Sequence, residues 1–221
     1  MPKKILFLIS GVFFGIIGPL IYYYRGYSEI LILFWILSFV LLTRFFIHRG
    51  GHSIRVSRAD LYALAALAII FIPLYFWKIY TVPFQVNTDE ITIMYFMKKL
   101  SSVPHPDIFA LSDYFYFPSF IFIVLGWVGK LMGGITLFHM RLIHATFGLG
   151  IIFATYIFFR LIFKDYFLAL AGALIVGSNH ALVAISRMAM RDNIALFLTL
   201  LAFIFLLRGF QKRSSVETYI G

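Results

Sequence analysis

Cysteine is absent from this chain of 221 residues, and acidic residues are scarce. The first absence excludes disulfide bridges, thiolate metal sites and a cysteine nucleophile. Charged residues make up 13% of the chain, against about 25% in soluble domains. Because 62% of the residues are hydrophobic, the composition excludes both a soluble globular fold and a disordered chain. Long apolar runs without alternation also argue against a β-barrel.

The composition therefore predicts an all-α, polytopic membrane protein, since helices satisfy their own backbone hydrogen bonds within lipid. The 19 basic residues outnumber the 9 acidic ones and give a net charge of +10. Cytoplasmic loops of membrane proteins are rich in lysine and arginine, so we attribute the excess to orientation in the bilayer. No nucleic-acid partner is expected.

Apolar runs of roughly 20 residues predict six transmembrane helices. They cover Ile5–Tyr24, Ser28–Ile47, Asp60–Tyr80, Phe138–Phe163, Tyr166–Ile185 and Asn193–Leu207. The loop at residues 48–58 is short and basic, which places it and both termini in the cytoplasm. The third run ends in Tyr75, Trp77 and Tyr80, which predicts an aromatic belt at the outer interface.

One further apolar segment, Pro118–Met132, is shorter than a span and contains Lys130. Its length and the distribution of basic residues predict a juxtamembrane or re-entrant helix that does not cross the bilayer. The result is one large external loop from about Thr81 to Leu137 and a short one at Ser186–Asp192.

The nine acidic residues divide into two groups. Four lie at span ends or in the tail and are expected to be solvated: Glu29, Asp60, Asp165 and Glu217. Five fall on the predicted external side: Asp89, Glu90, Asp107, Asp113 and Asp192. Because the positive-inside rule makes no demand on acids, this second group indicates a candidate site.

Asn87 and Glu90 have the spacing of a capping box at the start of an amphipathic helix that reaches about Leu100. Capping and the helix dipole explain Asp89 and Glu90 without any chemistry. The same dipole keeps Asp89 ionised, as a general base must be. The residues alone leave both interpretations open.

The second cluster contains Arg187, Arg191 and Asp192 in one short turn. The turn fits an internal ion pair that caps the last span. It fits a site for an anionic headgroup equally well, because guanidinium groups bind phosphate through paired hydrogen bonds.

Four motifs in a fixed order carry a resemblance to a known superfamily. They are Thr88-Asp89-Glu90, Tyr114–Pro118, Arg141–Gly148 followed by Tyr156 and Arg160, and Ser186–Asp192. In this order and spacing, residues 60–210 resemble the protein O-mannosyltransferases, the lipid A aminoarabinose transferases and related enzymes of the glycosyltransferase C superfamily. The chain departs from the O-mannosyltransferases at Phe117-Pro118-Ser119, where they carry His-Pro-Pro.

The resemblance implies an inverting glycosyltransferase that moves a sugar from a polyprenyl phosphate to a protein or lipid hydroxyl at the external or lumenal face. It implies that Asp89 is catalytic, with Glu90 beside it. Arg141, Arg187 and Arg191 would bind the donor phosphate. Asp192 would orient these arginines or help to hold a divalent cation, Mg or Mn, and the sequence does not decide whether a cation takes part.

The resemblance also sets the expected domain organisation. Residues 1–58 add two spans and the basic loop, residues 59–210 form the glycosyltransferase C-like module with the external loop 81–137, and residues 211–221 form a cytoplasmic tail. The family continues through further spans, so the chain looks truncated. An alternative is a non-catalytic subunit that binds a polyprenyl lipid or a partner protein, with a second subunit supplying the remaining spans. A small transporter is a third hypothesis, which predicts charges in mid-membrane and not at span ends.

Overall fold

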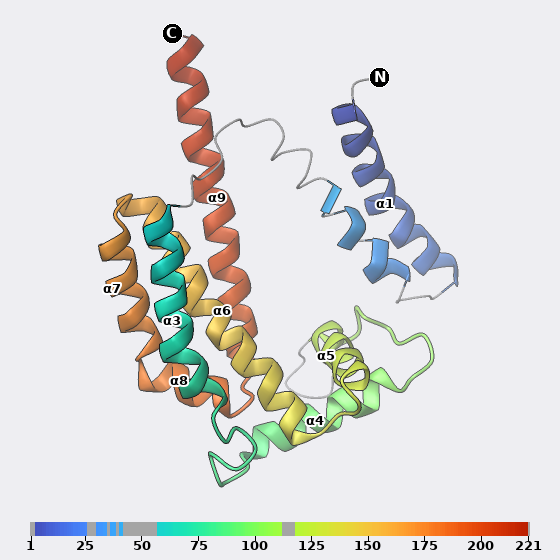
Figure 1. Cartoon of the computed structure of the whole chain (residues 1–221). Helices are drawn as coiled ribbons and strands as arrows, with labels where there is room; N and C mark the ends of the chain where they lie inside the picture. Colours follow the sequence, from blue (N-terminus) through green and yellow to red (C-terminus); the bar gives the residue numbers. More distant parts are fainter. Residues whose placement is uncertain are drawn as a thin grey trace. The chain divides into compact units, whose positions relative to one another are not determined.

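The computed structural model describes residues 3–25, 30–34, 36–38, 40–41, 57–111 and 118–220. The described residues are helical, apart from turns and one isolated bridge between Leu111 and Pro118, so the all-α class is confirmed. Figure 1 shows the helices α1 (Lys3–Arg25), α3 (Arg58–Phe76), α4 (Thr88–Ser101), α5 (Ser119–Leu131), α6 (Leu137–Phe163), α7 (Tyr166–Gly177), α8 (His180–Arg187) and α9 (Asp192–Ile220).

The chain forms two compact units. The first unit consists of Met1–Ile54 and Tyr95–Leu131, and the second of Arg55–Met94 and Met132–Gly221. Helix α4 gives its first half to the second unit and its second half to the first. The predicted division into residues 1–58, 59–210 and 211–221 stays a prediction.

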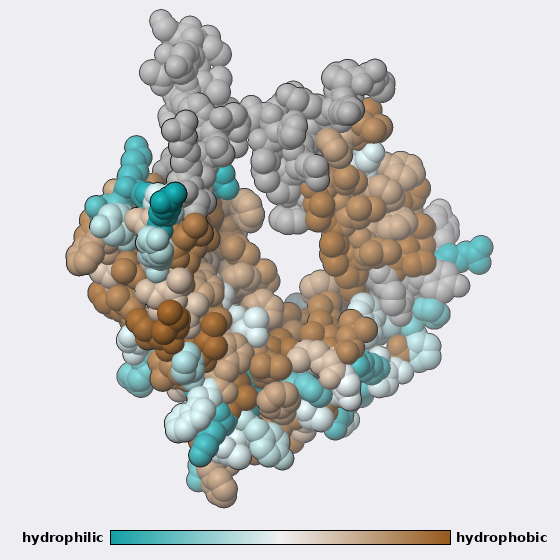
Figure 2. Space-filling model, viewed as in Figure 1, coloured by the Kyte–Doolittle hydropathy of each residue, from teal (hydrophilic) through white to brown (hydrophobic). Residues whose placement is uncertain are grey.

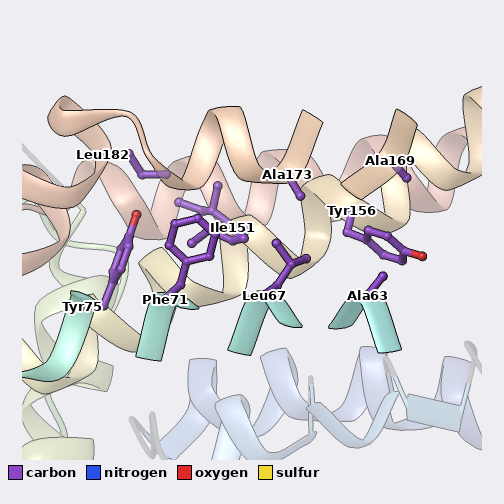
Figure 3. Packing of buried hydrophobic residues seen from close by; sticks show 10 residues of the cluster. Ala63, Leu67, Phe71, Tyr75, Ile151, Tyr156, Ala169, Ala173 and Leu182 are labelled. Atoms are coloured by element: carbon purple, nitrogen blue, oxygen red, sulfur yellow. The ribbon is translucent and has the colours of Figure 1, made fainter. Parts of the chain in front are cut away.

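In the second unit, α6 packs against α3, α7, α8 and α9 (Figure 1). Helix α3 buries a stripe with four-residue spacing, which places its side chains on one helix face. This stripe meets residues of α6, α7 and α8 in the core (Figure 3). The core residues are Ala63, Leu67, Phe71, Tyr75, Ile151, Ile152, Tyr156, Ala169, Ala173 and Leu182.

Two glycines allow close approach within this core, because small residues let membrane helices pack closely. A Cβ atom at Gly148 would collide with the side chains of Ser186 and Tyr75. A Cβ atom at Gly177 would lie 2.5 Å from the ring of Phe71. The helices therefore pack at distances that a larger residue would prevent.

Helices α3 and α6 are each long and apolar enough to cross a membrane. Helices α7 and α8 supply a third span if they are taken together. Figure 2 shows broad hydrophobic surface, with hydrophilic residues gathered toward the ends of the second unit. The chain is thus an integral membrane protein, while the count of six spans and the cytoplasmic termini stay predictions.

The predicted span at Tyr166–Ile185 is not one continuous helix. Helices α7 and α8 are bent by 59° at a break over Ser178 and Asn179. The side chain of Asn179 accepts hydrogen bonds from the backbone N–H groups of Ala181 and Leu182, so a new helix starts there.

Two further expectations about single residues are wrong. Tyr75 is not in an aromatic belt, because the buried stripe of α3 carries it into the core at 0% exposure. Asp60 is not a solvated flank: it is 5% exposed and accepts hydrogen bonds from Tyr156 Oη and Arg160 Nε, both at 2.7 Å. Asp165 is exposed as expected and caps α7.

In the first unit, α5 confirms a short helix at the predicted position, with 13 residues. Ile123 of α5 packs against Leu31 and Ile108 in a small apolar core. Its predicted failure to cross the bilayer stays a prediction. Several predicted features lie outside the described residues: Glu29, most of the basic loop 48–58, Asp113, the segment from Tyr114 to Phe117 and the side chain of Glu217.

Candidate functional site

The start of α4 is held by local hydrogen bonds, and this confirms the predicted cap. The Asn87 side chain accepts from the Asp89 N–H at 3.1 Å, and the Asn87 N–H donates to Glu90 Oε2 at 3.0 Å. Both acidic residues lie in the first turn of α4. Asp89 is partly exposed, whereas Glu90 is fully buried.

Glu90 forms a buried ion pair with Arg141 of α6. Arg141 Nε donates to Glu90 Oε1 at 2.8 Å, and Nη2 donates to Oε2 at 3.0 Å. The two side chains are 0% and 1% exposed. Since both oxygens of Glu90 are bound and shielded from solvent, the pair places the first turn of α4 against the start of α6.

The remaining N–H groups of Arg141 bind backbone carbonyls of the loop that joins α3 to α4. The acceptors are Ile79 at 3.4 Å, Tyr80 at 3.3 Å, Pro83 at 3.0 Å and Gln85 at 3.4 Å. All five N–H groups of this guanidinium thus have protein acceptors. The arrangement leaves none for a donor phosphate, so the predicted phosphate role of Arg141 is without structural support.

Arg187, at the end of α8, binds the same loop and the last turn of α3. Its Nη1 donates to the carbonyl of Leu74, and its Nη2 donates to those of Trp77 at 2.8 Å and Val82 at 3.0 Å. The residue is 9% exposed. Residues 77–86, which we call the clamped loop, are therefore held by two arginines from different helices.

Arg187 keeps unused donors, because its three bonds occupy only Nη1 and Nη2. Within the described part of the chain, its Nε–H has no acceptor. Arg191 is partly exposed, and Asp192 is exposed in the first turn of α9. Arg187 donates to backbone carbonyls and not to Asp192, so the predicted internal ion pair does not involve it.

The start of α9 is tied to α6 close to Arg141. Asn193 is 1% exposed, and its side-chain amide donates to the carbonyl of His144 at 3.3 Å. The acidic pair at α4 and the arginine turn before α9 therefore lie at the same end of the second unit, as the sequence predicts. Sequence reasoning missed Asn193, and a lone asparagine at a helix start gives no signal of a tertiary contact.

His144 itself is fully buried. Its Nδ1 lies 2.8 Å from the carbonyl of Met140, and its Nε2 has no partner among the described residues. The described residues contain no group of three or more histidine, aspartate or glutamate side chains that could hold a metal ion.

Comparison with known families gives one result. Residues 110–220 match the model of the dolichyl-phosphate-mannose-protein mannosyltransferase family. The match includes Arg141, Arg187, Arg191 and Asp192, and it begins after Asp89 and Glu90. Searches of curated proteins and of solved structures find no match.

Proposed function

The chain belongs to the dolichyl-phosphate-mannose-protein mannosyltransferase family, and on this premise we propose that it transfers mannose or a related sugar from a polyprenyl-phosphate donor. The acceptor is a hydroxyl group of a protein or lipid at the external or lumenal face. The observation that carries the proposal is the partly exposed Asp89 beside the buried Glu90–Arg141 pair.

Asp89 is the general base of the proposed reaction. Its carboxylate takes the proton of the acceptor hydroxyl while the hydroxyl oxygen bonds to the anomeric carbon of the sugar. The bond from that carbon to the phosphate breaks on the opposite face, so the carbon is inverted and polyprenyl phosphate leaves. A positioned general base contributes roughly 10²–10⁴ in rate.

Glu90 and Arg141 are positioning residues in this proposal, because every polar atom of the pair is bound within the protein. They hold the turn that carries Asp89, and a fixed base needs less reorganisation in the transition state. Arg191 and the unused N–H of Arg187 neutralise the leaving phosphate, since guanidinium groups bind phosphate oxygens well. Asp192 orients Arg191, since Arg187 is held by backbone carbonyls.

The test uses the full chain reconstituted in lipid, with a mannosyl polyprenyl phosphate and a hydroxyl-bearing acceptor peptide. Asp89→Asn should lower turnover about 10²–10⁴-fold with unchanged thermal stability. Asp107→Asn is the matched control, because Asp107 is an exposed acid that accepts hydrogen bonds from the nearby N–H groups of Phe109 and Ala110, and it should keep turnover. Full turnover of Asp89→Asn would remove Asp89 from the role.

Two further arms complete the assay. Turnover measured with a chelator and with added Mg or Mn shows whether a divalent cation takes part, since no proposed step requires one. Donor binding by the unmodified chain without any turnover would favour the alternative, a non-catalytic subunit that binds a polyprenyl lipid.

A further inference from the structure

Backbone carbonyls of the clamped loop accept hydrogen bonds inside the protein, while its large apolar side chains are exposed. Two buried arginines bind its carbonyls, as described above. Five of its exposed side chains are large and apolar: Trp77 at 70%, Tyr80 at 64%, Val82 at 47%, Phe84 at 93% and Val86 at 43%. The polar side chains of Lys78, Thr81 and Gln85 are exposed as well. The loop thus presents an apolar surface although it has no regular secondary structure.

This division suits contact with lipid and not contact with water. Carbonyls of a loop in water can bind water and need no buried guanidinium. Irregular backbone at membrane depth is stable only where the protein itself satisfies its polar groups. The single charged side chain of the loop is Lys78, whose ammonium lies 5.2 Å from the centre of the Trp77 ring and can extend toward the headgroups.

The loop also continues an apolar surface that faces lipid. Helix α3 is long and apolar enough to span a membrane. Its exposed side chains toward the loop are Ile69 at 74%, Ile72 at 46% and Leu74 at 43%. Trp77 follows directly, and tryptophan and tyrosine are the side chains enriched at membrane–water interfaces.

We propose that the clamped loop inserts into the boundary between headgroups and acyl chains of the bilayer, with Val82 and Phe84 in contact with lipid. The two arginines make this possible because they satisfy the carbonyls that the loop would otherwise expose to hydrocarbon. The inserted loop fixes the depth of the turn that carries Asp89. The proposal concerns lipid contact alone, so its failure would leave the transferase function standing.

The absence of cysteine makes the test direct, because a single introduced cysteine takes the only spin label. Phe84→Cys and Val82→Cys are labelled in the full chain and reconstituted in vesicles of phosphatidylcholine and phosphatidylglycerol. Collision rates are measured with oxygen, which concentrates in lipid, and with a water-soluble nickel chelate. Ile69→Cys is the lipid-facing control and Arg58→Cys the water-facing control, since both side chains are exposed.

The labels at 82 and 84 should collide with oxygen more often than the label at 58 does. Their collision rate with the nickel chelate should be several times lower than that of the label at 58. Nickel access equal to that at 58 would overturn the proposal. Protection that appears only after polyprenyl phosphate is added would also overturn it, because the donor tail and not the bilayer would then cover the loop. Phe84 is 93% exposed, so its replacement removes no buried packing.

Discussion

The two ends of α6 each carry an arginine that binds a carboxylate, and they differ in burial and in what they hold. At the site end, Arg141 and Glu90 are 1% and 0% exposed. At the other end, the side chains of Arg160 and Asp60 are 26% and 7% exposed. An arginine–carboxylate pair is therefore shielded from solvent at one end, whereas at the other end its arginine is partly exposed.

The partners of the two pairs differ as well. Arg141 also binds four carbonyls of the clamped loop, so its pair positions irregular backbone beside the candidate base. Asp60 is bound by Ser57 and Tyr156 in addition to Arg160, so its pair fastens the start of α3 to the last turns of α6. The pair at one end holds a loop, and the pair at the other end joins two helices.

The largest expected effect comes from Arg141→Met. This change leaves a buried carboxylate at Glu90 and several carbonyls without donors, which should lower the free energy of unfolding by about 3–5 kcal/mol. Thermal unfolding in detergent measures the loss, and turnover should fall as well. The double variant with Glu90→Gln should recover part of the stability, and an unchanged melting temperature for Arg141→Met would contradict the buried pair.

Asp60→Asn at the opposite end should cost less, about 1–3 kcal/mol, since Arg160 can reach water when its partner is neutral. The same unfolding measurement applies. Turnover per folded molecule should stay at the unmodified level, because this end holds no loop beside Asp89. A loss of turnover that matches that of Arg141→Met would erase the distinction between the two ends.

Arg187→Lys should lower the free energy of unfolding by less, roughly 1–2 kcal/mol. Lysine keeps the charge, but its single ammonium group cannot reach all three carbonyls that the planar guanidinium binds. Turnover should fall, since the clamped loop leads into the turn of Asp89. Arg160→Lys is the matched control at the other end and should keep turnover. Equal turnover of the two variants would show that the clamp does not position the site.

A still smaller effect is expected for Tyr156→Phe, which removes one hydrogen bond to Asp60 and no packing volume. A loss of about 0.5–1.5 kcal/mol is expected, because Asp60 keeps its bonds to Arg160 and Ser57. Tyr75→Phe should cost less still, since the Tyr75 hydroxyl lies 3.4 Å from its acceptor at Gly177. A reversed order would contradict these geometries.

Local features of the sequence predicted much of the fold. The predicted span Phe138–Phe163 corresponds to α6, Leu137–Phe163, and the predicted helix from Asn87 to Leu100 corresponds to α4. The break at Ser178 and Asn179 was predictable too, because Asn after Gly-Ser is a cap signal within an apolar run. The length of the apolar run alone favours one span there.

The sequence draws attention to the charged residues of the candidate site and does not show what they bind. Asp60 follows Ser57 with the spacing of a capping box, so its hydrogen bonds with Ser57 could be predicted from the sequence. Its other partners, Tyr156 and Arg160, come from a distant helix. Likewise, Arg187 was a candidate for phosphate, and its three acceptors are backbone carbonyls that no side-chain pattern reveals.

By itself, the sequence determined the membrane class, the positions of α4 and α6 and the cap at Asn87, because apolar run length and capping depend on neighbours along the chain. The tertiary structure alone decided that Tyr75 is buried in the core and that every N–H group of the Arg141 guanidinium has an acceptor in the protein. It also decided that two arginines hold one loop. An arginine binds any carbonyl within reach, so its partner is selected by helix packing and not by residue type.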